Sequence, residues 1–163
     1  MADDAPVTAA CEQAWLRGPV LSTPRPLTTL NEPSSRQLSP FLTADGLTLS
    51  FTSAGPGTHD VYLATRAALD LPSGAPMPVA SVNTPANDYE LRTSPDGREA
   101  FVGSDRGGQS DIWRAERDTA DGPWSPFAVV AELATSATEY NPMLAAGDRT
   151  LYFAAVDRLG GLG

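Results

Sequence analysis

The sequence contains few of the residues from which catalytic and metal centres are commonly built. Its single cysteine, Cys11, excludes an intrachain disulfide and leaves the redox compartment undefined. With His59 as the only histidine, a metal cluster rich in histidine is excluded too. A Ser-His-Asp or Cys-His arrangement would have to use His59, which we place at an exposed loop tip. We therefore expect a non-enzymatic protein without a cofactor.

Positive charge and long apolar runs are also scarce. The chain has 11 Lys and Arg residues against 20 Asp and Glu residues, which gives a net charge of −9. This balance argues against nucleic acid and anionic membrane surfaces as partners, because both attract basic side chains. No apolar run approaches the roughly 18 residues of a membrane span, so we expect no membrane insertion. The acidic start Met1–Asp4 lacks the basic and apolar regions of a signal peptide.

Glycine and proline, in contrast, are abundant, and the chain repeats itself. The 14 glycines and 15 prolines in 163 residues favour many turns and short strands. Asp45-Gly46 and Asp96-Gly97 lie 51 residues apart, and a third copy places Tyr140 where Tyr89 stands. Such a period is typical of stacked supersecondary units. We divide the chain into a leader over residues 1–24, partly disordered or with a short helix at Thr8–Arg17, and repeats over 31–82, 83–133 and 134–163.

Each full repeat is predicted to contain four antiparallel strands. Asp-Gly pairs suit the hairpin turn between the first two strands, because both residues accept positive φ. Apolar residues on both faces of the second strands indicate sheets packed between two neighbours. Leu27–Leu30 is predicted as a lone fourth strand. The other predicted strands are Leu38–Thr43, Leu47–Ser53, Asp60–Thr65, Pro78–Val82, Tyr89–Ser94, Arg98–Ser104, Asp111–Glu116, Phe127–Leu133 and Thr150–Ala155.

Four antiparallel strands in a unit of about 40–50 residues form the blade of a β-propeller. We therefore predict an all-β fold, a partial β-propeller over residues 25–163 with about two full blades and parts of flanking ones. A propeller needs roughly four or more blades to close. We expect the chain to be part of a longer protein, or an arc that self-associates through its open sheet edges.

Three motifs in the second repeat resemble the WD-like repeats of TolB-type β-propellers. They are Ser94-Pro95-Asp96-Gly97-Arg98, the stretch Phe101–Arg106, and Asp111-Ile112-Trp113-Arg114-Ala115. The resemblance covers about residues 26–163. It implies a bacterial protein of the periplasm or cell envelope that binds a protein or an envelope component. Similar propellers also precede peptidase domains, so an enzyme-associated propeller is an alternative, as is a truncated fragment without activity of its own.

Polar side chains on or just before the first strands are the candidate ligand-binding residues. In propellers these strands line the central channel and their ends face the usual binding mouth, where polar groups could grip a peptide, a glycan or an ion. The alternative is that they only solvate a water-filled channel. The candidates are Arg36, Gln37, Tyr89, Glu90, Arg92, Glu139, Tyr140 and Asn141. Glu90 and Glu139 lie on neighbouring repeats, which leaves open a paired-carboxylate site acting on glycans.

Two carboxylates flank the glycine-rich loop at Gly107-Gly108. Asp105 and Asp111 on such a loop suit Ca²⁺ as oxygen ligands. The alternative is turn capping with an Asp–Arg pair that fixes the hairpin. The first repeat has Ala54 in place of Asp105 yet keeps Asp60 in place of Asp111, which favours a structural role. We therefore predict no metal site, with Asp105 and Asp111 as weak candidates.

Overall fold

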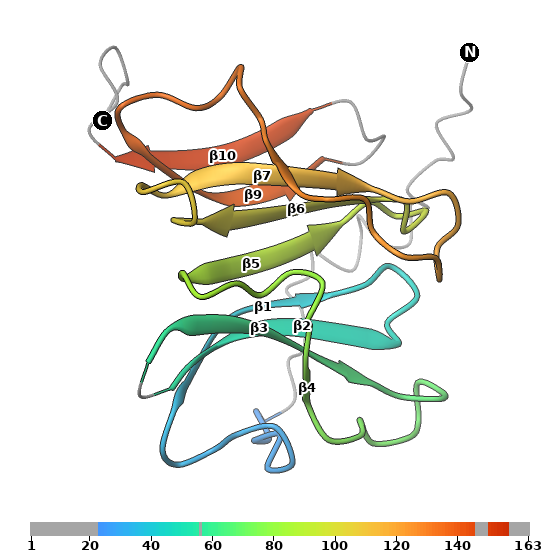
Figure 1. The fold of residues 1–163 in the computed structure, drawn as a ribbon. Helices are drawn as coiled ribbons and strands as arrows, with labels where there is room; N and C mark the ends of the chain where they lie inside the picture. The colour runs from blue at the N-terminus through green and yellow to red at the C-terminus, as the bar shows by residue number, and fades with distance from the viewer. Residues whose placement is uncertain (1–22, 56, 146–149, 157–163) are drawn as a thin grey trace, which may run out of the picture.

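The computed structural model of the chain describes residues 23–55, 57–145 and 150–156. The predicted helix at Thr8–Arg17 lies outside this part. Among the described residues there are strands, turns and loops, and no helix that could cross a membrane. The strands form three antiparallel sheets that stack on one another in chain order (Figure 1).

The first two sheets have four strands each, and every strand pairs with the next one in the sequence. The first sheet contains β1 (Arg36–Leu42), β2 (Thr48–Ala54), β3 (His59–Thr65) and β4 (Met77–Pro78). The second contains β5 (Asp88–Thr93), β6 (Glu99–Ser104), β7 (Asp111–Glu116) and β8 (Ala128–Val129), and the third pairs β9 (Thr138–Leu144) with β10 (Leu151–Val156). The all-β fold with four-stranded, propeller-like blades is confirmed. Within the described residues the sheets do not close into a barrel.

The predicted fourth strands are too long. Pro78–Val82 and Phe127–Leu133 shrink to the two-residue strands β4 and β8. The physical reason is a tight turn that starts directly after each of them. The Val82 N–H donates to the Val79 carbonyl at 2.9 Å, and the Leu133 N–H donates to the Val130 carbonyl at 2.9 Å. These turns carry the chain from the outer strand of one sheet to the first strand of the next.

The lone strand predicted at Leu27–Leu30 is wrong. This segment is the same turn in its first occurrence, since the Leu30 N–H donates to the Leu27 carbonyl at 2.9 Å. The Asn31 N–H donates to the same carbonyl at 3.1 Å. Leu30 is buried, with 4% of its surface exposed, so the turn anchors the chain against the first sheet.

The predicted hairpin turns are present. Gly46 and Gly97 both have a φ of 70°, in the left-handed region that glycine adopts at little cost. Each turn is braced from a distance by an arginine: Arg66 Nε donates to the Gly46 carbonyl at 2.8 Å, and Arg117 Nε donates to the Gly97 carbonyl at 2.6 Å. The two arginines keep the 51-residue spacing, so the brace recurs with the turn.

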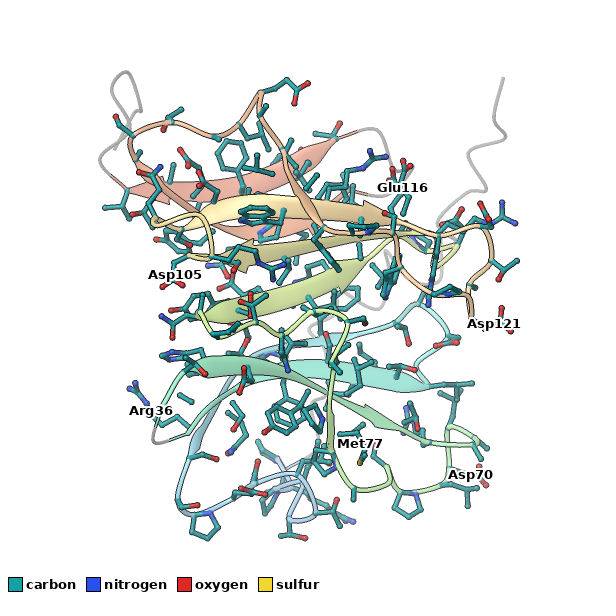
Figure 2. All side chains as sticks on the ribbon, viewed as in Figure 1. Arg36, Asp70, Met77, Asp105, Glu116 and Asp121 are labelled. Carbon is teal, nitrogen blue, oxygen red and sulfur yellow. The ribbon has the colours of Figure 1, made fainter. Side chains whose placement is uncertain are left out.

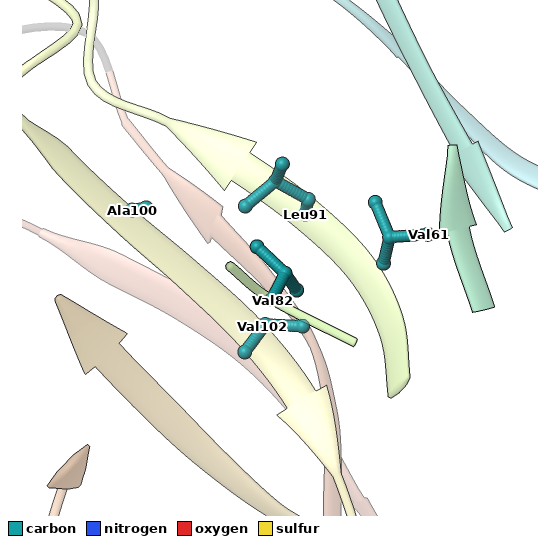
Figure 3. Packing of buried hydrophobic residues seen from close by; sticks show 5 residues of the cluster. All are labelled: Val61, Val82, Leu91, Ala100 and Val102. Carbon is teal, nitrogen blue, oxygen red and sulfur yellow. The ribbon is translucent and has the colours of Figure 1, made fainter. Parts of the chain in front are cut away.

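The apolar core lies between the first and second sheets (Figure 3). Val61 of β3 faces Leu91 of β5, and Val82 from the connecting turn packs with Ala100 and Val102 of β6. Almost every residue of β6 is buried, on both of its faces. For β6 this confirms the expectation of a sheet packed between two neighbours, whereas in β10 Tyr152 has 64% of its surface exposed.

Candidate functional site

Each first strand contains an irregularity at the same position of the repeat. The strand register shifts within β1, β5 and β9, and in each strand a residue other than glycine has a positive φ. These residues are Ser39 (49°), Glu90 (63°) and Asn141 (54°), spaced 51 residues apart. A bulge of this kind re-aims side chains on a strand, and it is frequent at functional sites.

Glu90 links the three bulges to one another. Its Oε2 accepts a hydrogen bond from the Asn141 backbone N–H at 2.5 Å, and its Oε1 accepts one from Ser39 Oγ at 3.4 Å. With its amide nitrogen turned toward Glu90, the Asn141 side chain also donates at 2.6 and 3.2 Å. Burial raises the pKa of Glu90, while the Asn141 N–H and the nearby Arg92 charge oppose that rise. We call Ser39, Glu90, Arg92 and Asn141 the first-strand row.

Arg92 completes the row from the same strand as Glu90. Its guanidinium donates to the Ser39 carbonyl at 3.2 Å and to the Leu91 carbonyl at 3.3 Å, and lies 5.2 Å from the centre of the Phe41 ring. Burial lowers the pKa of Arg92, and the charge of Glu90 counteracts this. Arg92 Nε is buried and has no hydrogen-bond partner in the part of the chain that the structure describes. The row therefore holds its two charged side chains inside the protein.

Gly103 makes room for the Glu90 carboxylate. A Cβ atom added at Gly103 would lie 3.5 Å from Glu90 Oε2 and 3.9 Å from Tyr140 Cα. The equivalent residue of the first sheet is Thr52, whose Oγ1 accepts the Glu90 backbone N–H at 3.1 Å. The backbone N–H of Glu90 thus donates to a hydroxyl between the first and second sheets, and that of Asn141 donates to a carboxylate between the second and third sheets.

Four other predicted ligand-binding residues do not belong to the first-strand row. Arg36 is exposed at the start of β1 (Figure 2), and Gln37 donates its amide to Ser35 Oγ at 2.7 Å. Tyr89 packs against His59, with ring centres 4.9 Å apart. Tyr140 is half-buried, facing Gly103 across the second and third sheets.

His59 is not at an exposed loop tip. It is the first residue of β3, it is half-buried, and its Nδ1 lies 3.1 Å from Asn87 Oδ1. Its backbone N–H donates to the same Asn87 oxygen at 3.0 Å. The pairing of β3 with β2 extends one residue further than the loop pattern suggested, and this draws the histidine into the sheet.

The weak metal candidates separate in the structure. Asp105 accepts the Asn87 backbone N–H at 2.8 Å and the Asn87 side-chain amide at 2.6 Å, so its carboxylate joins the end of β6 to the residue before β5. Asp111 instead lies beside Glu139, at the start of β9. Among the described residues, no three or more His, Cys, Asp or Glu side chains form a group suited to a metal ion.

The structure also contains a cleft that the sequence did not indicate. It has a volume of about 350 Å³ and lies between the first two sheets, at the end where both Asp-Gly turns stand. Phe41, Leu63, Leu91 and Trp124 form its apolar walls. These residues look like ordinary core positions in the sequence, and only the stacking of two sheets reveals that they border a cavity.

The turn aspartates at the cleft are held by their own turns. Asp45 Oδ1 accepts the Thr43 hydroxyl at 2.6 Å and the Leu47 N–H at 2.9 Å. Asp96 Oδ1 accepts the equivalent bonds from Ser94 at 2.6 Å and from Arg98 at 3.0 Å. These hydrogen bonds lower the pKa of both aspartates. At the cleft margin, the Arg117 guanidinium lies 3.9 Å from the centre of the Trp124 ring system.

No protein-family model, curated protein or solved structure matches this chain. The resemblance to TolB-type repeats therefore stays a prediction from the motifs themselves. What the chain does has to be argued from the first-strand row and the cleft.

Proposed function

We propose that this chain is a non-enzymatic binding module whose ligand contacts the first strands and the cleft beside them. The supporting observation is the Glu90 carboxylate, which joins the first strands of three repeats through Ser39 and Asn141. A surface held by buried hydrogen bonds loses little conformational freedom when a ligand binds. Such a rigid, polar row is suited to recognition.

The row and the cleft form one continuous region. The Phe41 ring contacts the Arg92 guanidinium and also lines the cleft, and Leu91, whose carbonyl accepts a hydrogen bond from Arg92, lines the cleft as well. The cleft falls within the range of about 300–1,000 Å³ of small-molecule sites, and its walls are mainly apolar. We propose a protein or envelope component as partner, with an apolar group in the cleft and polar contacts at exposed Asn141. The TolB-like motifs are the reason to favour the periplasm or cell envelope.

The alternative of a glycan-acting propeller gains no support from the two glutamates. Glu90 has 8% of its surface exposed and Glu139 has none. Each is bound to different neighbours, Glu90 to Ser39 and Asn141 and Glu139 to Thr135. A glycosidase needs its two carboxyl groups on either side of a substrate bond.

The test is site-specific photo-crosslinking of the full chain in bacterial cells. A photo-reactive amino acid is placed at Asn141 or at Ala44, an exposed residue that borders the cleft. The control position is Ala128, which is exposed on the outermost strand β8. We expect the same adduct from the first two positions and none from the third. Equal labelling at all three positions, or labelling at Ala128 alone, would contradict the proposal.

A further inference from the structure

A second group of residues, distinct from the first-strand row, surrounds the start of β9. Glu139 is fully buried there. Its Oε1 accepts the Thr135 hydroxyl at 2.5 Å, but its Oε2 has no hydrogen-bond partner among the described residues. A buried carboxylate oxygen normally has such a partner, because leaving it unpaired costs free energy. The free oxygen therefore calls for a partner that the described part of the chain does not supply.

The neighbouring side chain, Asp111, adds a second carboxyl group to this buried site. Asp111 of β7 has 8% of its surface exposed, and its carboxyl group lies within hydrogen-bonding reach of the Glu139 carboxyl group. Burial raises the pKa of Asp111, and the negative charge of Glu139 raises it further. No arginine or lysine forms an ion pair with either carboxylate in the described part of the chain. Two acidic groups thus share one buried place without a neutralising charge.

Further oxygen atoms converge beside this pair. The Gln109 amide nitrogen donates to the Thr135 carbonyl, to the Ala137 carbonyl at 3.1 Å and to Asp111 Oδ1 at 3.5 Å. The Gln109 amide nitrogen thus contacts three oxygen atoms at once. Gln109 is partly exposed and Thr135 is exposed, which gives a route from solvent. Carboxylate and carbonyl oxygens are the ligands that Ca²⁺ takes in proteins, with six to eight of them around the ion.

We propose that Asp111 and Glu139 bind one Ca²⁺ ion between the second and third sheets. The ion takes the free Glu139 oxygen and the Asp111 carboxylate as its charged ligands. The Thr135 and Ala137 carbonyls, which Gln109 now occupies, and water complete its oxygen shell. Asp105, which the glycine-rich loop had suggested, takes no part, because its carboxylate is bound to Asn87. Since Asp111 belongs to β7 and Glu139 to β9, the ion ties the two sheets together.

The test is calorimetric titration of the chelator-treated full chain with CaCl₂, followed by thermal unfolding with and without the ion. We expect one Ca²⁺ per chain, a higher unfolding midpoint with Ca²⁺, and weaker binding of MgCl₂. Glu139→Gln and Asp111→Asn each remove a charged ligand with little change of shape. Each should weaken Ca²⁺ binding by about 100-fold or more, since ligand charge sets affinity.

The matched control is Asp60→Asn, because Asp60 holds the position of Asp111 in the first repeat. This variant should bind Ca²⁺ like the original chain. Circular dichroism in chelator separates lost binding from lost folding, and Gln109→Ala, which only vacates the carbonyls, should bind Ca²⁺ at least as well. An absence of Ca²⁺ binding by the folded original chain would overturn the proposal. So would equal affinity in Glu139→Gln, or stability that responds to pH but not to Ca²⁺, which would indicate a shared proton.

Discussion

Asp88 and Glu139 occupy the same position in consecutive repeats, 51 residues apart, yet their surroundings differ. Asp88 Oδ2 accepts the Thr84 backbone N–H at 2.6 Å and the Thr84 hydroxyl at 2.9 Å. Its Oδ1 accepts the Ser104 hydroxyl at 2.6 Å and pairs with the Arg106 guanidinium at 2.5 Å. Among the described residues, the Glu139 carboxylate accepts a hydrogen bond only from the hydroxyl of the equivalent threonine, Thr135. Both oxygens of the Asp88 carboxylate therefore have partners in the protein, whereas within the described part of the chain one oxygen of the Glu139 carboxylate is free to bind a ligand.

The sequence explains the difference. Ala155 stands where Ser104 would recur, and Asp157 stands where Arg106 would recur. The third repeat thus retains the acidic residue but replaces both of its partners. A carboxylate kept without its cation needs another source of positive charge. The comparison shows that the 51-residue repeat determines the position of a carboxylate, whereas the neighbouring residues determine whether it is neutralised within the protein.

Removal of the Arg106 guanidinium, which pairs with Asp88, should have the largest effect on stability. In Arg106→Met, Asp88 would remain buried as an unpaired charge, which costs about 3 kcal/mol or more. We expect the free energy of unfolding, measured by urea denaturation, to fall by about that amount. Arg98→Met, at an exposed arginine, should change it by less than about 0.5 kcal/mol. Similar losses for the two variants would show that the Asp88 ion pair does not differ from a surface charge.

Exchange of the residue pair Glu90 and Gly103 for the equivalent pair Ser39 and Thr52 of the first sheet should have an intermediate effect on stability. Gly103→Thr introduces the side chain of Thr52 beside the Glu90 carboxylate: the added Cβ would already be in contact with Oε2 at 3.5 Å, and the atoms beyond it would overpack the site at a cost of about 2 kcal/mol. Adding Glu90→Ser, which recreates the Ser39 and Thr52 pair, should recover most of the loss. The readout is the unfolding free energy of the single and double variants. If the two losses simply add, the carboxylate and the glycine are independent of one another.

The pH dependence of the first-strand row should be the smallest effect. Burial raises the pKa of Glu90 above its ordinary value of 4.5 in the folded protein. The folded state therefore favours protonated Glu90, and this stabilisation is complete below pH 4.5 and lost as the pH rises through the raised pKa.

Glu90→Gln removes this titration. The unfolding free energy of the original chain, minus that of the variant, should fall as the pH rises from below 4.5 toward neutrality. Chemical denaturation across that range provides the measurement. A difference that stays constant with pH, or rises with it, would show that Glu90 titrates as in the unfolded chain.

The features that the sequence predicted well are those that depend on local chemistry. The Asp-Gly turns and the apolar runs of the second strands need only neighbours along the chain. The fourth strands were predicted too long because Val79 and Val130 suit a strand, whereas tertiary packing turns the chain there. His59 was misplaced for a similar reason, since the length of β3 depends on its pairing with β2.

The parts of the candidate site that depend on stacking were not predictable. Ser39, Glu90 and Asn141 share a left-handed backbone but no side-chain type, and of the three only asparagine commonly adopts it. Asp111 and Glu139 were both named from the sequence, but in different roles, because their meeting requires the third sheet to pack on the second. The alignment of Ala155 with Ser104 and of Asp157 with Arg106 indicates in the sequence that Glu139 lacks the partners of Asp88.

The Glu90 bridge has a consequence for how the stacked sheets unfold. In a linear array of repeats, each unit usually stabilises only its immediate neighbours, so the ends can unravel independently of one another. Glu90 contacts Ser39 on one side and Asn141 on the other with a single carboxylate. Loss of either outer partner frees that carboxylate to move and weakens its bond to the other. We therefore expect the unfolding of the outer sheets at Ser39 and Asn141, 102 residues apart in the chain, to be coupled through this one side chain.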